Sequence, residues 1–202
     1  MTDTPQLDRP DRVGMYVSIA IVALAAVLAI VSAVGRLVEV GDGTDVPVTV
    51  PLTGETAALP LGPNGAAVEA VVQTATVTVP QPAPATLFAL YAEPVWLALM
   101  VIVGVAFAAA FFLRLARGLA FERGTSRLVY VAAGVLLVGW FVGGVLTNMT
   151  VHGALSAVSD YTYDSISFEV SLVPFFVYLV VGAFAAALQI GERLQRDTEG
   201  LV

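Results

Sequence analysis

The chain has 202 residues, of which 58% are hydrophobic and only 12% are charged, and it contains no cysteine. Soluble domains carry roughly 25% charged residues, so this composition argues against a soluble enzyme and is typical of an integral membrane protein. Nine basic residues against sixteen acidic ones give a net charge of −7, which argues against a protein that binds nucleic acid through phosphate contacts. The lack of cysteine excludes disulfides, thiolate metal sites and a cysteine nucleophile.

Four stretches of the chain are long and apolar enough to cross a bilayer core, which takes about 20 residues of helix. They predict an all-α polytopic membrane protein with four transmembrane helices, at residues 14–35, 95–113, 128–147 and 170–190. The first stretch could also be a signal peptide cleaved after Val31-Ser32-Ala33. It is longer than the roughly 7–15 apolar residues of a usual signal peptide, however, and we therefore favour a retained span.

The arginines predict the orientation of the spans, because cytoplasmic loops keep basic residues. All the arginines except Arg36 lie before the first span, between the second and third, or after the fourth. We therefore expect a bacterial cell membrane protein whose cytoplasmic parts are residues 1–13, 114–127 and 191–202. The extracytoplasmic parts are then residues 36–94 and 148–169. Nine acidic residues and one arginine give them a charge of −8, and the cytoplasmic parts carry +1.

The first extracytoplasmic segment is predicted to form a small β-rich cap. Residues 46–52 alternate valine or leucine with proline or threonine, and residues 70–79 are rich in valine and threonine, which is typical of half-buried strands. Gly62-Pro63-Asn64-Gly65 indicates a turn between them, so we expect a hairpin. The prolines of the first strand favour an edge position. Residues 165–170 alternate with a period of two and predict a further strand in the same cap.

The spans contain no Asp, Glu, Lys, Arg or His. Ionisable residues inside a membrane usually mark proton relays and ion pathways. The sequence therefore argues against a proton-coupled pump or an ion exchanger, and transport of a neutral solute stays open.

Two groups of residues resemble metal sites only weakly. His152 with Asp160 and Asp164 offers imidazole and carboxylate ligands, but the spacing matches no established pattern, and a solvated loop explains it equally well. Asp42 and Asp45 resemble part of a calcium loop without its further oxygen ligands, so a turn beside the membrane is the better interpretation. We expect no catalytic residue, no metal and no cofactor, and we do not expect an enzyme.

Small residues four positions apart predict where helices pack closely, since such residues let backbones approach in lipid. They occur on the third span and on the fourth, as the predicted helix-packing residues Gly139, Gly143, Gly182 and Ala186. Packing within one chain is the first interpretation, and the seam of a homo-oligomer is the alternative.

The link between the second and third spans carries arginines at three- and four-residue spacing. Such a basic helix end is expected to contact membrane lipid headgroups, and a docking surface for a cytoplasmic protein partner is the alternative. The residues concerned are Arg114, Arg117, Phe121, Arg123 and Arg127.

The C-terminal tail has a pattern that is unusual for a chain end, with apolar residues among alternating charges. Its motif residues are Gly191, Leu194, Gln195, Asp197, Gly200 and Leu201. One hypothesis is that the tail folds back on the basic link, with Glu192, Asp197 or Glu199 pairing with Arg117, Arg123 or Arg127.

This tail, together with Gly118-Leu119-Ala120-Phe121 in the basic link, resembles a bacterial integral-membrane family known as domain of unknown function 2975. The resemblance implies the same order of one span, an outer segment and three further spans. It also hints at a regulatory or stress-related membrane role. The family has no established activity, so it supplies no catalytic residues.

Together these patterns predict a non-enzymatic membrane scaffold, sensor or accessory subunit that couples the outer cap to a cytoplasmic partner. A small-solute transporter, or a subunit of one, is the alternative, and an enzyme acting on lipid comes third. A transporter would need a polar cavity, which these spans barely supply.

Overall fold

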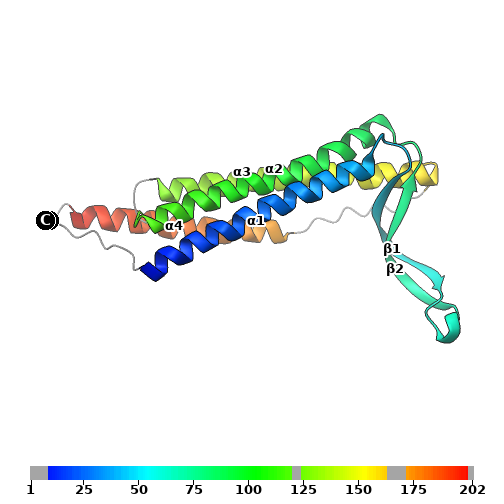
Figure 1. Cartoon of the computed structure of the whole chain (residues 1–202), viewed down its shortest axis with the longest axis horizontal. Coiled ribbons are helices and arrows are strands. Elements are labelled where there is room, and N and C mark those ends of the chain that lie inside the picture. The colour runs from blue at the N-terminus through cyan, green and yellow to red at the C-terminus, as the bar shows by residue number, and fades with distance from the viewer. Residues whose placement is uncertain (1–8, 120–123, 163–171, 200–202) are drawn as a thin grey trace. The chain divides into compact units, whose positions relative to one another are not determined.

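The computed structural model describes residues 9–119, 124–162 and 172–199. They form long helices and one two-stranded sheet (Figure 1). In chain order the elements are α1 Arg9–Val40, β1 Val46–Leu59, the 3-10 turn η1 Pro63–Gly65, β2 Val68–Val79, α2 Pro84–Ala116, α3 Thr125–Ser159 and α4 Val173–Glu199.

Four described helices are long and apolar enough to cross a membrane, which confirms this part of the sequence prediction. Their candidate spans are Val13–Val40, Pro84–Ala116, Thr125–Ser159 and Val173–Leu194. Most side chains of each apolar stretch are not buried by the rest of the protein. In water this surface would be costly, whereas lipid is as apolar as the side chains themselves.

The chain folds into two compact units. The helical unit takes its described residues from Met1–Ala33, Val95–Gly143 and Ser171–Val202, and the hairpin unit from Val34–Pro94 and Gly144–Val170. Because α2 and α3 continue across the boundaries of these ranges, both helices contribute residues to both units.

The hairpin unit has a dry core built on one face of β1. Val46, Val48 and Val50 are at most 2% exposed, because alternate side chains of a strand point to the same face. They pack with Val79 of β2 and with residues from three helices, namely Val40, Leu90 and Ala154. The valine and proline alternation in the sequence therefore does mark a half-buried strand.

The two strands pair antiparallel, as the sequence predicts, with Val46 opposite Val79 and Leu59 opposite Val68. The register shifts between Pro51 and Glu55, where Gly54 adopts a positive φ of 77°. At the predicted turn, Asn64 and Gly65 have φ values of 59° and 80°, a left-handed conformation that asparagine and glycine tolerate best. The hairpin prediction is confirmed, and among the described residues the sheet consists of these two strands.

The helices extend well beyond the predicted apolar spans. α2 begins at Pro84 rather than near Val95, and α3 continues to Ser159 through a stretch that the sequence suggested was a loop. The added turns of α3 bury Thr150 and Ala154 in the hairpin unit, so tertiary packing supports helix where hydropathy alone does not extend it. The further strand predicted at residues 165–170 lies outside the described residues.

Candidate functional site

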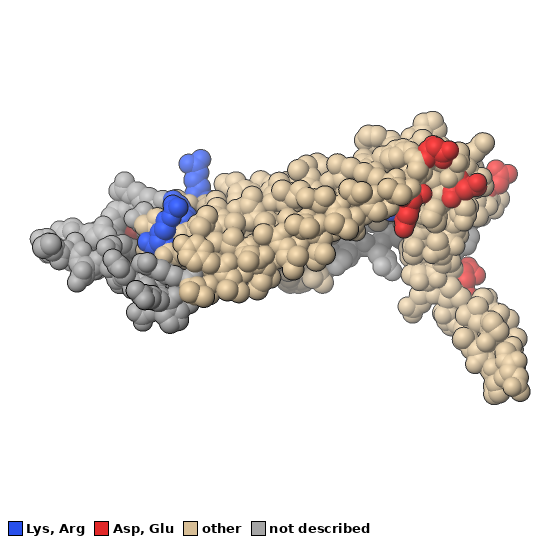
Figure 2. Space-filling model, viewed as in Figure 1, with Lys and Arg blue, Asp and Glu red and all other residues tan. Residues whose placement is uncertain are grey.

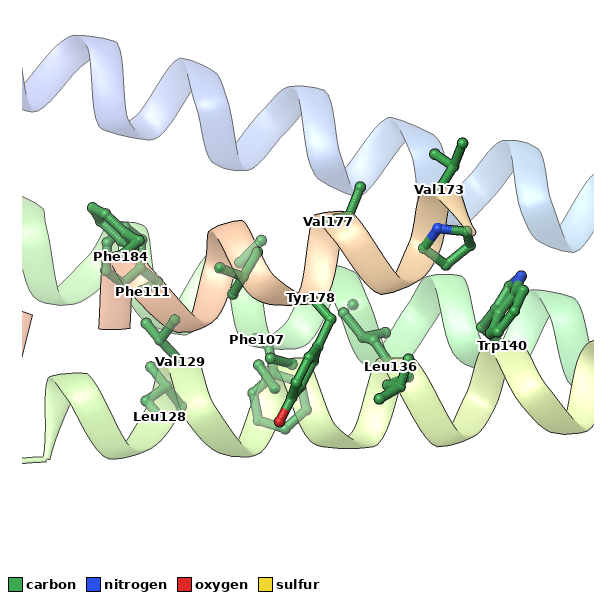
Figure 3. Close-up of a pocket in the computed structure, with 17 residues that line it drawn as sticks. Phe107, Phe111, Leu128, Val129, Leu136, Trp140, Val173, Val177, Tyr178 and Phe184 are labelled. Carbon is green, nitrogen blue, oxygen red and sulfur yellow. The ribbon is translucent and has the colours of Figure 1, made fainter. Parts of the chain in front are cut away.

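A cavity of about 540 Å³ lies in the helical unit between α2, α3 and α4 (Figure 3). Its wall is built from alanine, glycine, proline, aliphatic and aromatic residues, so the only polar side-chain atoms are the Tyr178 hydroxyl and the Trp140 indole nitrogen. The lining residues are Gly104, Phe107, Ala108, Phe111, Leu128, Val129, Ala132, Ala133, Leu136, Leu137, Trp140, Val173, Pro174, Val177, Tyr178, Val181 and Phe184.

Aromatic residues mark the two ends of this cavity. Phe111 of α2 and Phe184 of α4 meet edge to face at one end, with ring centroids 6.1 Å apart and an interplanar angle of 73°. Trp140 and Val173 lie at the other end, and Tyr178 lies between them with its ring across the space (Figure 3). The cavity is thus elongated along the helices and chemically uniform.

Close packing between α2 and α3 flanks the Trp140 end of the cavity. The Trp96 indole nitrogen donates a hydrogen bond of 2.9 Å to the Gly139 carbonyl. A Cβ atom on Gly139 would overlap the Met100 side chain, and one on Gly143 would lie 3.5 Å from Leu97. Both predicted glycines of the third span therefore sit where α2 approaches closely.

The predicted helix-packing pair on α4, Gly182 and Ala186, is packed less closely than the pair on α3. No atom lies within 4 Å of a Cβ built on Gly182, and Ala186 is only partly buried. The buried positions of this helix are instead Ala185, Leu188 and Glu192, which follow one face at three- and four-residue spacing.

A polar cluster lies where α3 begins. The Ser126 backbone N–H donates to Glu192 Oε1 at 2.8 Å, so α4 supplies a carboxylate to the first turn of α3. First-turn N–H groups have no partner within their own helix, and the helix dipole favours negative charge there. Thr125, Ser126 and Glu192 are all buried.

Arg114 completes this cluster from α2. Its guanidinium donates to the Thr125 hydroxyl at 3.2 Å, and that hydroxyl donates to the Leu119 carbonyl at 3.1 Å. Glu192 thus lies beside the first turn of α3, within a helix that continues to Glu199. Among the described residues, its hydrogen-bond partner is a backbone N–H rather than an arginine.

The remaining predicted residues of the link and the tail are spread over the surface. Arg117, Arg127 and Asp197 are exposed, and Leu194 is 62% exposed. Gly191 is partly buried on α4. Other predicted positions lie outside the described residues or side chains: Phe121, Arg123, Gln195, Gly200 and Leu201.

In the hairpin unit, one carboxylate joins α2 to α3. Glu93 Oε1 accepts a hydrogen bond from the Thr147 hydroxyl at 2.6 Å, and Oε2 accepts one from the Thr150 hydroxyl at 2.9 Å. Sequence reasoning missed this arrangement. The available signal was a Glu-Pro pair at the start of an apolar stretch together with two threonines three residues apart, which lie on one side of a helix.

Neither weak metal-site pattern gathers further metal ligands among the described residues. Within the described ranges no group of three or more His, Cys, Asp or Glu side chains could hold a metal ion, and Asp164 lies outside them. Asp42 forms a turn instead, accepting hydrogen bonds from the Thr44 hydroxyl at 2.8 Å and the Thr44 backbone N–H at 3.2 Å. The Thr44 hydroxyl and N–H bonds lower the pKa of Asp42 below its usual value.

The two units differ in the balance of their charged side chains. Figure 2 shows red acidic groups over the hairpin unit and blue basic groups over the helical unit. The described acidic residues of the hairpin unit are Glu39, Asp42, Asp45, Glu55, Glu69, Glu93 and Asp160. Arg36, its one described basic residue, is paired with Glu39 at 2.9 Å.

Comparison of the chain with family models, curated proteins and solved structures finds no match. The resemblance of the C-terminal tail to a family of bacterial membrane proteins therefore stays a prediction.

Proposed function

We propose that this chain is a non-enzymatic membrane scaffold, sensor or accessory subunit that couples its hairpin unit to a protein partner at the arginine-bearing helix ends. The observation that carries the proposal is that α2 and α3 contribute to both units and are hydrogen-bonded to each other in each of them. Glu93 holds Thr147 and Thr150 in the hairpin unit. In the helical unit, Trp96 holds Gly139 and Arg114 holds Thr125.

The proposed setting is a bacterial cell membrane, with both chain termini and the α2–α3 connection in the cytoplasm. The distribution of charge supports this orientation, because arginines are kept on the cytoplasmic side. Arg36 is the exception, and its ion pair with Glu39 offsets its charge. The hairpin unit would then present its acidic surface on the opposite side.

The alternative, a small-solute transporter, has less support from the cavity. A polar solute that leaves water must exchange its hydrogen bonds for new ones, and a hydroxyl or amide without partners costs about 1–3 kcal/mol. The wall offers only Tyr178 and Trp140 for this purpose. An apolar cavity suits the packing or binding of apolar groups instead.

Site-specific photo-crosslinking in native membranes tests the coupling proposal. A photoreactive residue at Arg117, an exposed residue of the basic link, should capture one discrete protein, whereas the same residue at Leu28 of α1 should capture mainly lipid. Glu93→Ala should lower capture at Arg117 several-fold, because it removes the bonds to Thr147 and Thr150.

The matched control is Glu69→Ala on the exposed face of β2, which should leave capture unchanged. Equal capture in the wild type and in Glu93→Ala would contradict the coupling. Solute flux through vesicles that contain only the purified chain would favour the transporter.

A further inference from the structure

We propose that the cavity between α2, α3 and α4 binds one acyl chain of an anionic phospholipid whose headgroup lies beside Arg127. This binding site goes beyond the proposed coupling function and does not depend on which side of the membrane the arginines occupy.

The first argument is the chemistry of the wall. Phe107, Leu136 and Val177 contribute apolar surface from three different helices. An occupant without hydrogen-bonding groups loses nothing on entering such a space, whereas a hydrated one loses its water. The volume of about 540 Å³ lies within the usual range for sites of small ligands, about 300–1,000 Å³.

The second argument is the length of the cavity. Its lining residues on α3 run from Leu128 to Trp140 and on α4 from Val173 to Phe184. At about 1.5 Å per residue these stretches measure roughly 18 Å and 16 Å. One leaflet occupies about half of a bilayer core of about 30 Å, so the cavity matches the length of one extended acyl chain.

The third argument is the charge at one end. Leu128 lines the cavity and directly follows Arg127, which is exposed at the start of α3. A lipid whose acyl chain is bound along α3 would therefore place its headgroup near the Arg127 guanidinium. Basic residues at a membrane surface attract anionic lipids, and arginine binds phosphate oxygens in a bidentate geometry.

A second copy of the chain fits the cavity poorly. A helix with side chains is about 10–12 Å wide, so a segment as long as the cavity would occupy well over about 1,000 Å³. The cavity provides about half of that volume. An acyl chain is much narrower than a helix and therefore suits this space better.

Photolabelling maps the occupant directly. The full chain is reconstituted in vesicles of phosphatidylglycerol and phosphatidylcholine that contain a trace of phosphatidylglycerol with a diazirine in one acyl chain. After illumination, labelled residues are identified by mass spectrometry. We expect labels at Phe107, Leu136 and Tyr178 to exceed those at Leu28, an exposed residue of α1, by several-fold.

Two variants with one control sharpen the result. Ala132→Phe fills the cavity and should lower its labelling at least fivefold, whereas Ala183→Phe, on an exposed position of α4 outside the wall, should not. Arg127→Gln should lower the preference for phosphatidylglycerol over labelled phosphatidylcholine by about fivefold, the effect of one basic residue near a membrane surface.

Labels spread evenly over all exposed apolar residues would overturn the proposal, and so would cavity labelling that is equal in wild type and Ala132→Phe. Equal labelling by the two lipids in the wild type would overturn the headgroup assignment.

If Ala132→Phe does not fold, the label map of the unmodified chain decides. A photoreactive residue at 178 that captures a second copy of the chain would also contradict an acyl chain in the cavity.

Discussion

The two units bury their apolar residues in opposite ways. In the hairpin unit, Val46, Val50 and Val79 are fully buried between a sheet and three helices. In the helical unit, Val13 and Ile21 of α1 are 60% and 63% exposed. The hairpin unit therefore has a core that the hydrophobic effect stabilises in water, whereas the helical unit exposes apolar surface of the kind that lipid would cover.

The polar contacts follow the same division. The hairpin unit places Glu93 between two threonine hydroxyls, and the helical unit places Glu192 at the start of α3. Neither carboxylate lies in a predicted apolar span. These contacts lie at or just beyond the limits of the predicted apolar spans, whereas the bond from Trp96 to the Gly139 carbonyl lies within them.

Loss of the buried leucine in the hairpin unit should have the largest effect. Leu90 is 1% exposed, and Leu90→Ala should lower the free energy of unfolding by about 2–5 kcal/mol. Leu28→Ala, at a position that is 60% exposed, should change it by less than about 0.5 kcal/mol. Guanidinium unfolding in detergent micelles measures both, and similar losses would contradict the division between the units.

Overpacking in the helical unit should have the second-largest effect on the free energy of unfolding. Gly139→Leu forces a side chain into the space of Met100 and should cost about 1–3 kcal/mol in the same unfolding experiment. Gly134→Leu is the matched control, because nothing lies within 4 Å of a Cβ there. Lower stability with unchanged mobility on a native gel supports packing within the chain. Unchanged stability with altered mobility would indicate an oligomer seam instead.

Removal of the charge at the start of α3 should have a smaller effect. Glu192→Gln keeps an oxygen acceptor for Ser126 but loses the favourable interaction with the helix dipole, so we expect a loss of about 1 kcal/mol. Arg193→Gln alters the exposed neighbouring residue and is the control. Thermal unfolding in detergent checks the pair, and equal melting temperatures for Glu192→Gln and the wild type would refute the contribution.

The smallest expected effect concerns the exposed turn of the hairpin unit. Thr44→Val removes the hydroxyl that donates to Asp42 and should raise the pKa of Asp42, while Thr44→Ser should keep it low. Because the folded-state pKa is lowered, the stabilising contribution is present above the unfolded-state pKa and is lost as the pH falls through the folded-state pKa. Carbon-13 NMR titration of the carboxyl group measures the shift, and identical values in both variants would rule out the hydroxyl as the cause.

The sequence predicts the spans and the hairpin well because both depend on local pattern. Apolar runs identify α1 to α4, and alternation of valine with proline or threonine identifies β1. Helix ends are predicted less well. Residues 148–159 continue α3 because Thr150 and Ala154 are buried against other elements, and no local pattern reports such contacts.

The candidate site is beyond the reach of the sequence for a different reason. The spans are apolar on every side, so no periodicity indicates which face of α3 meets α4 and where a space remains between them. Gly182 illustrates the difficulty, since it has the same four-residue spacing as Gly139 but no close neighbour. Glu192 was expected at the basic link from charge alone, whereas its bond to the Ser126 N–H requires the fold.

Labelling of single cysteines in intact cells tests the proposed orientation most directly. In that orientation, the segment that contains the hairpin and the α2–α3 connection face opposite sides of the membrane. The chain has no cysteine of its own, so each introduced one is unique. A membrane-impermeant maleimide should label Glu69→Cys, on the exposed face of β2, before permeabilisation, and Arg117→Cys, beside the α2–α3 connection, only afterwards. Labelling of both positions from the same side would contradict the account.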